Sequence, residues 1–243
     1  MSVELDANHA AFEQRWKAQR EQTEDGLEGH DIFGRAFRRL VAMQAWRSEL
    51  LDTKTTTAAL QFAIEGQNDL LAAYLLARGG QWRSALQAQR AALENYLNFL
   101  FFKDHPVELE LWTDGRYQTK FSELHSYFLK HPLNAGREPR RCGLDTIKSE
   151  YAVLSKAVHG SAAAFRMSSD DGPKFFVQDQ ALLGKWDHRN RQVVRGLCLL
   201  MLSLFRDELV ATRKRNLRKS LALALRSGDK DWIKAEYQVT IPF

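Results

Sequence analysis

The chain has 243 residues, 44% hydrophobic and 27% charged, a composition typical of folded globular proteins. A chain of this length can bury most of its surface without disulfides, and its two cysteines, Cys142 and Cys198, fit a reducing compartment. Residues 1–6 lack the basic and apolar regions of a signal peptide. The apolar run 196–205 is shorter than the roughly 20 residues that a membrane helix needs. We expect a soluble, cytoplasmic protein with no membrane span.

The net charge of +5 is unevenly distributed. Residues 1–121 contain 14 Lys and Arg against 17 Asp and Glu, whereas residues 122–243 contain 21 against 13. Arginine outnumbers lysine by 22 to 13, and the planar guanidinium group of arginine is better suited than the lysine ammonium to bind a phosphate through two hydrogen bonds. The second half therefore suggests a nucleic-acid or nucleotide partner, although a solvated basic surface explains the same charges.

Helical periodicity dominates the first half of the chain. Residues 8–25 are polar and predict an exposed helix, and a second helix follows from Phe33 to about Leu51. The polar residues 52–55 can cap a third helix, which Gly79 and Gly80 end. A fourth helix is expected over residues 82–102. The apolar residues expected to be buried are Leu60, Ile64, Leu71 and Leu75 in the third helix and Trp82, Leu86, Leu93, Leu97 and Leu100 in the fourth.

The second half contains shorter predicted helices separated by turns. A helix over residues 118–129 precedes a basic loop, 131–143, which contains prolines and glycines. A helix starting near Asp145 follows, and then a hairpin or loop over 168–184. A long core helix is expected from Trp186 to Val210, then a basic amphipathic helix over 213–226 and a terminal helix with a tail.

These elements predict an all-α fold, a single-domain helical bundle of about seven to nine helices spanning residues 1–243. Residues 1–25 form a peripheral N-terminal helix in this interpretation, and residues 211–243 form a basic C-terminal helix and tail. The common phosphate-loop, dinucleotide, zinc and nucleophile-elbow motifs are absent from the sequence. We therefore expect no cofactor and no metal site.

Two helical segments carry the polar residues most suggestive of chemistry. In the segment 151–161, Ser155 and His159 are four residues apart and share a helix face. His159 stands in the last helical turn before Gly160, where the helix dipole favours its protonated form, although a histidine there can also simply cap the helix. In the fourth helix Arg90 and Glu94 are also four residues apart, and they form either a surface ion pair or an oriented guanidinium that meets a phosphate.

Two clusters of basic residues are candidate contacts for nucleic acid. One lies in the loop 131–143, and the other begins the basic C-terminal helix, where Leu217, Leu221 and Leu225 should anchor the opposite face. A solvated basic face is the alternative for both clusters. The candidate nucleic-acid-binding residues are Arg137, Arg140, Arg141, Arg213, Lys214, Arg215, Arg218 and Lys219.

The all-helical layout, the Arg90-x-x-x-Glu94 helix and the Tyr-x-x-Leu-Ser-x-x-Val-His-Gly segment at 151–160 together resemble the HEPN-type helical proteins of bacterial toxin and phage-defence systems. The resemblance covers roughly residues 55–210, which would form a HEPN-like core. It implies a homodimer and, in active members, a metal-independent ribonuclease whose motif places an arginine a few residues before a histidine. The matching histidine is His159, but positions 152–154 before it are Ala, Val and Leu.

The missing arginine favours a non-catalytic helical module that binds nucleic acid or a partner protein of a defence or toxin-like system. The first alternative is a HEPN-type endoribonuclease, in which His159 acts as general acid or base and Arg90 stabilises the phosphate charge. The second is a nucleotide or small-molecule sensor. We also expect a homo-oligomer, from the resemblance and from the aromatic residues Trp112, Tyr117 and Phe121.

Overall fold

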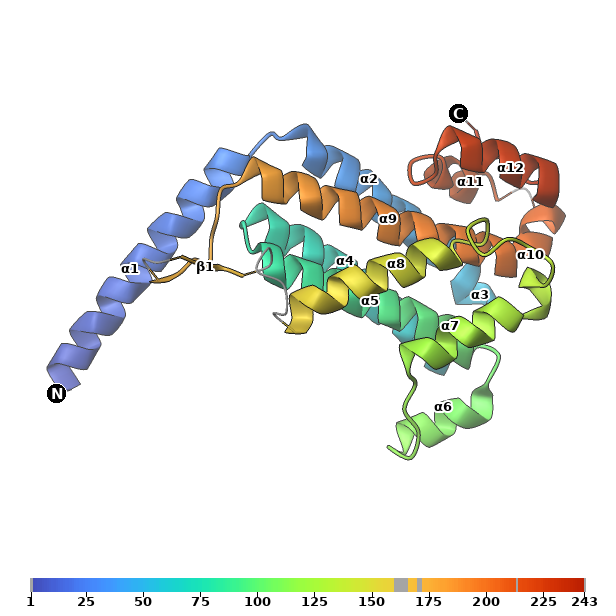
Figure 1. Cartoon of the computed structure of the whole chain (residues 1–243), viewed down its shortest axis with the longest axis horizontal. Helices are drawn as coiled ribbons and strands as arrows, with labels where there is room; N and C mark the ends of the chain where they lie inside the picture. Colours follow the sequence, from blue (N-terminus) through green and yellow to red (C-terminus); the bar gives the residue numbers. More distant parts are fainter. Residues whose placement is uncertain (1, 160–165, 170–171, 213, 243) are drawn as a thin grey trace.

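The computed structural model describes residues 2–159, 166–169, 172–212 and 214–242 (Figure 1). Within these ranges the fold is all-α, as predicted, apart from two-residue strands that pair antiparallel. The elements are α1 (Ser2–Leu27), α2 (Asp31–Trp46), a π-helical turn (Arg47–Leu51), α3 (Asp52–Lys54), α4 (Thr57–Arg78), α5 (Trp82–Phe102), α6 (Pro106–Thr113), α7 (Phe121–Lys130), a 3-10 turn (Pro132–Asn134), α8 (Leu144–His159), β1 (Ser168–Ser169), β2 (Gly172–Pro173), α9 (Gln180–Leu204), α10 (Arg206–Ala211), α11 (Arg215–Leu221) and α12 (Ser227–Tyr237).

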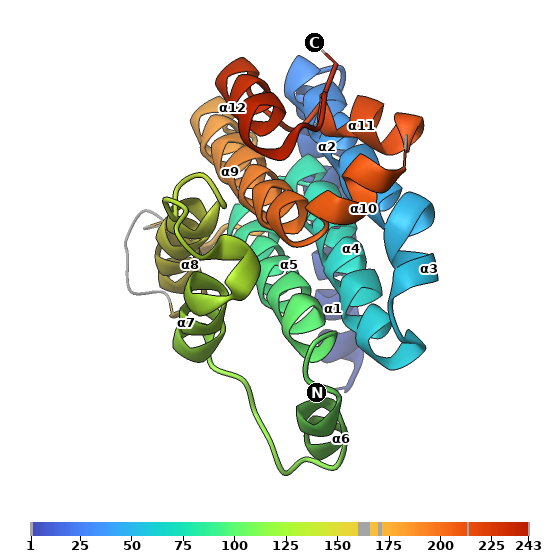
Figure 2. The same ribbon diagram turned by 90° about the vertical axis from the view of Figure 1, so that its right-hand side faces the viewer.

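The centre of the molecule is a bundle in which α5 contacts α4, α8 and α9 (Figures 1 and 2). Helix α5 is the most central element because its apolar residues recur at helical spacing over its whole length. All five of its predicted core residues, from Trp82 to Leu100, are buried. Helix α2 covers α4 and α9 on the other side. Helix α1 extends well away from this bundle, and most of its residues are exposed (Figure 1).

Helix α4 buries a different face from the one predicted. Leu71 and Leu75 are 46% and 57% exposed, and Leu60 and Ile64 are only half-buried. The buried residues are mostly small: Ala59, Phe62, Ala63, Gly66, Leu70, Ala73 and Ala77. The reason is close approach to α5, since a Cβ atom on Gly66 would lie 2.7 Å from the ring of Tyr96.

Three helices of the described residues, α3, α6 and α10, were not predicted, and they raise the helix number above seven to nine. The long helix does not continue to Val210. It ends at Leu204 because Phe205 leaves the helical conformation (φ −117°), and the Phe205 ring packs 6.2 Å from that of Trp46. The basic helix predicted over 213–226 is confined to α11, because the side chain of Asp229 accepts the Arg226 N–H and begins α12 instead.

Helices α11 and α12 cover one end of the bundle. Figure 2 shows α12 lying across α9, with α11 on one side of it and the segment between α7 and α8 on the other. Leu217, Leu221 and Leu225 are buried, as predicted for the apolar face of the basic segment. Among the helices of the described residues, we find none with both the length and the apolar composition needed to cross a bilayer.

Candidate functional site

Arg90 and Glu94 form the predicted pair and lie against α8. Arg90 Nη2 is 3.0 Å from Glu94 Oε1 and donates to the hydroxyl of Tyr151 at 2.9 Å. The guanidinium carbon also lies 5.0 Å from the centre of the Tyr151 ring, whose plane is stacked with that of Phe121 at 3.7 Å. Burial raises the pKa of Glu94, while the charge of Arg90 lowers it. The Arg90 guanidinium is therefore engaged within the fold, holding α5 to α8.

Ser155 and His159 occupy the positions on α8 that the sequence predicted, but they do not join Arg90. The Ser155 hydroxyl donates to the Tyr151 carbonyl at 2.7 Å, which is the local backbone bond that serine commonly forms within helices. His159 is the last residue of α8 and is exposed. It lies eight residues beyond Tyr151, about 12 Å along the helix axis. The four residues of the predicted catalytic group are thus spread along the seam between α5 and α8.

The end of α8 is held by an arginine that the sequence interpretation left without a role. Arg83, in the first turn of α5, donates through Nε to the Ala157 carbonyl at 3.0 Å and through Nη2 to the Val158 carbonyl at 3.2 Å. The last carbonyls of a helix have no intrahelical partner, so Arg83 satisfies them. Its position seven residues before Arg90, on the same face of the helix, was the available signal. The feature beside His159 is a structural helix cap.

The loop between α7 and α8 contributes to two adjoining cavities. The first, about 230 Å³, is lined by Arg140 and Arg141 together with Thr146 of α8, Arg195 of α9, and Asp229 and Trp232 of α12. The second, about 310 Å³, is lined by Gly136, Arg137, Glu138, Arg141, Trp232 and Glu236. Arg141 and Trp232 line both cavities, and the Arg141 guanidinium carbon is 5.6 Å from the Trp232 ring. We call Arg137, Arg140, Arg141, Arg195 and Trp232 the arginine site.

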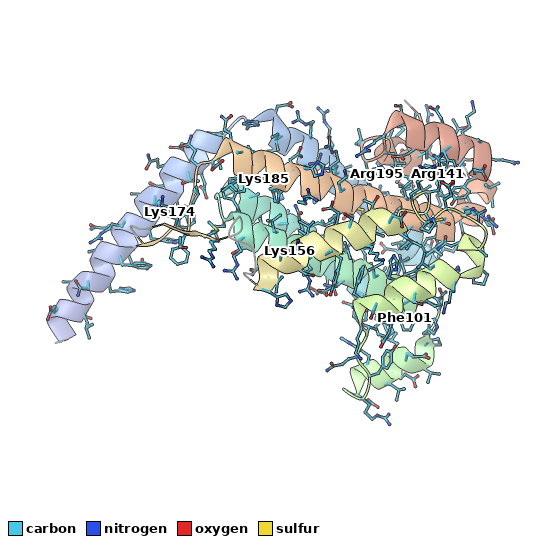
Figure 3. The ribbon with its side chains drawn as sticks, in the orientation of Figure 1. Phe101, Arg141, Lys156, Lys174, Lys185 and Arg195 are labelled. Carbon is cyan, nitrogen blue, oxygen red and sulfur yellow. The ribbon has the colours of Figure 1, made fainter. Side chains whose placement is uncertain are left out.

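The base of the arginine site is fixed by an ion pair between α9 and α12. Arg195 donates to Asp229 through two nitrogens, at 2.7 and 2.6 Å, a bidentate geometry that orients the guanidinium. A further nitrogen lies 3.4 Å from the Thr146 hydroxyl. Figure 3 shows Arg195 and Arg141 close together at the end of the bundle beneath α12. Arg195 is therefore a fixed but largely neutralised cation at this position.

The loop arginines differ in how freely they can bind a ligand. Arg137 donates to the Leu133 carbonyl and lies 5.2 Å from the Tyr237 ring, so it holds the loop to α12. Arg140 and Arg141 share Glu138, at 2.5 and 3.9 Å, and their side chains are 67% and 40% exposed. Because exposed ion pairs contribute about 0–1 kcal/mol, a phosphate can displace Glu138 from both.

The second basic cluster lies on α11, across α12 from the arginine site (Figure 2). Arg213 lies outside the described residues. Arg218 donates to the carbonyls of Leu209 and Thr212, so its guanidinium caps the end of α10. Arg215 and Lys219 are exposed and Lys214 is half-buried. Of the four residues of this cluster that the structure describes, Lys214, Arg215 and Lys219 remain candidate contacts.

Neither a metal site nor a nucleophilic cysteine is supported in the described part of the chain. No group of three His, Cys, Asp or Glu side chains there could hold a metal ion. Both cysteines are buried. Burial raises the pKa of the Cys142 thiol, and it raises the pKa of the Cys198 thiol to about 12. A thiol with a raised pKa is a poor nucleophile near neutral pH because the thiolate is the reactive form.

The sequence predicted Arg137, Arg140 and Arg141 but missed Arg195, Asp229 and Trp232. The missed residues come from two helices that meet the loop only in the folded chain. A tryptophan in the short charged segment 229–234 was the one signal that could have indicated them.

Comparisons with protein-family models, with curated proteins and with solved structures found no match to this chain.

Proposed function

We propose that this chain is a non-catalytic helical module that binds nucleic acid, RNA in the first instance, through the arginine site. The observation that carries the proposal is the meeting of Arg140, Arg141 and Arg195 with Trp232 around two adjoining cavities. Cations bind the phosphate backbone, and an aromatic ring beside them offers a surface on which a base stacks. The proposal keeps the setting that the HEPN resemblance implies, a bacterial defence or toxin-like system in the cytoplasm.

The geometry supports binding better than ribonuclease chemistry. Arg90 is already bonded to Glu94 and Tyr151, and His159 lies about 12 Å along α8 from Tyr151. A general acid or base must stand within hydrogen-bond reach of the reacting proton, while a cation faces the phosphate. Because these two groups are not together in one chain, His159 and Arg90 cannot share a phosphate without a rearrangement.

The test is fluorescence anisotropy with a labelled single-stranded RNA of mixed sequence, over a series of salt concentrations. The double variant Arg140→Ala with Arg141→Ala should bind at least about 10-fold more weakly, with a salt slope about 1.4 units shallower if each arginine contacts one phosphate of a single strand. The matched control is Arg116→Ala with Lys120→Ala, which removes two cations from exposed positions between α6 and α7.

Equal losses in the two double variants would show nonspecific charge attraction and contradict the proposal. Wild-type protein that binds neither RNA nor DNA would also contradict it, and the arginine site would then remain a surface for an acidic protein. Mononucleotides that bind as tightly as the RNA strand would favour the sensor alternative.

A further inference from the structure

The two cavities of the arginine site share a wall but differ in chemistry. The first cavity contains the exposed Arg140, Arg141 and the hydroxyl of Thr146, and its one acid, Asp229, is paired with Arg195. The second cavity contains Glu138 and Glu236. Glu236 is exposed and forms no ion pair with another residue of the described ranges. The first cavity therefore favours an anion, and the second, which Arg137 and Arg141 also line, adds two carboxylate acceptors.

Arg141 and Trp232 form the wall between these cavities. Trp232 is half-buried and is held by an edge contact with Tyr237 at 4.8 Å. Trp232 lines both cavities, with the Arg141 guanidinium carbon 5.6 Å from its ring, and every nucleobase can stack on an aromatic ring surface. The second cavity, at about 310 Å³, is at the lower end of the range for small-ligand pockets.

We infer that the arginine site takes an unpaired nucleotide, with its base in the second cavity against Trp232 and its phosphate in the first cavity at Arg140 and Arg141. This inference rests on the proposed function and specifies its ligand as single-stranded nucleic acid. A base within a duplex cannot occupy the second cavity, because its faces are stacked and its edge is paired. The strand crosses the wall once, between the base and its phosphate.

The carboxylates of the second cavity also select among bases. A carboxylate accepts hydrogen bonds and repels carbonyl oxygens, so Glu236 favours a base edge that carries an amino group. Cytosine presents an amino donor where uracil presents an oxygen acceptor. These two bases have the same size and similar stacking surfaces, so their comparison isolates the contribution of the carboxylate. The site should therefore prefer cytosine over uracil.

The test compares labelled single-stranded RNA octamers of cytidine and of uridine, together with a mixed 12-nucleotide strand alone and in its duplex. Wild-type protein should bind the cytidine octamer about 10-fold more tightly than the uridine octamer, as one specific base contact allows. It should also bind the free 12-nucleotide strand more tightly than the duplex. Glu236→Gln should remove most of the preference for cytidine while leaving the binding of uridine within about threefold.

Stacking is tested with Trp232→Leu and Trp232→Phe. The leucine variant should weaken the binding of both octamers by about 10- to 100-fold, whereas phenylalanine, which retains a ring, should restore most of the affinity. The matched control is Trp112→Leu, since Trp112 is 42% exposed on α6 and lines neither cavity. Thermal melting of each variant separates loss of binding from loss of the fold.

The outcomes separate this inference from the proposed function. If the arginine double variant loses binding while Trp232→Leu and Glu236→Gln bind as wild type does, the nucleotide pocket is refuted and the phosphate-binding surface remains. Equal affinity for the strand and its duplex refutes the pocket in the same way. If wild-type protein binds no RNA or DNA, both proposals are refuted.

Discussion

Replacing Asp187 of α9 with alanine should destabilise the fold strongly, because it breaks a largely buried ion pair with Arg39 of α2. Arg39 of α2 donates to Asp187 and, through Nε, to Asn190 at 2.6 Å. The side chains of Arg39 and Asp187 are only 5% and 13% exposed. Burial lowers the pKa of Arg39, and the carboxylate of Asp187 opposes that effect. Asp187→Ala therefore leaves a guanidinium buried without its counter-ion.

Breaking a buried ion pair in this way costs about 3–5 kcal/mol. For a chain of this length, 1 kcal/mol shifts the melting temperature by about 2–4 °C, so the expected decrease is about 6–20 °C. The measurement is differential scanning calorimetry at neutral pH, with reversibility checked by a second scan. The double variant Arg39→Met with Asp187→Leu removes both charges and should recover most of the loss, because apolar residues can replace a buried pair at little cost. A double variant as unstable as Asp187→Ala would refute this reasoning.

Three further predictions concern the helix end, the oligomeric state and pH. His159→Ala should leave the melting temperature and RNA binding unchanged, whereas Arg83→Ala should lower the melting temperature by about 2–10 °C by leaving two carbonyls of α8 uncapped. RNA cleavage by wild-type protein that His159→Ala abolishes would count against the non-catalytic assignment. Light scattering at micromolar concentration should show a homodimer, and if the exposed Phe37 and Leu71 form its interface, Leu71→Glu should yield monomer; a wild-type monomer would end this idea. Burial raises the pKa of Glu150 above its ordinary value of 4.5. The ionised carboxylate therefore lowers the stability of the fold at a pH above the folded pKa, and this loss is absent below pH 4.5. Glu150→Gln loses the ion pair with Arg189 but cannot ionise, so its melting temperature should vary less than that of wild type as the pH rises from 4.5 through the folded pKa.

Helix ends could be predicted where glycine or proline marks them in the sequence. The bounds of α5, Trp82–Phe102, match the prediction because Gly79 and Gly80 precede it and Pro106 follows it. Gly80 has φ +67°, and a Cβ atom there would lie 2.6 Å from the Val177 carbonyl, so glycine is required at that turn. Signals of this kind are local, and local signals are fully visible in one sequence.

The buried face of α4 could not be predicted in the same way. Periodicity pointed to Leu71 and Leu75, but α4 approaches α5 through alanines and Gly66. Helices that pack closely bury small residues, and the area gained by two backbones in contact is not visible in a hydrophobic pattern. Because α4 buries its small residues, Leu71 and Leu75 are exposed on its outer face, as is Phe37 on α2. These residues, rather than Phe121, which stacks on Tyr151, are the better candidates for a contact between chains.

The candidate site shows the same division between local and tertiary information. Charge density predicted both the arginines of the loop and the denser basic cluster at α11, yet their surroundings differ. Arg218 is used to cap α10, whereas Arg140 and Arg141 border cavities that α9 and α12 complete. A basic cluster becomes a binding site only when another element supplies a wall, and here Trp232 does so from about 90 residues further along the chain. For that reason the loop, and not the segment with the higher charge density, is the part of the chain on which the binding experiments should begin.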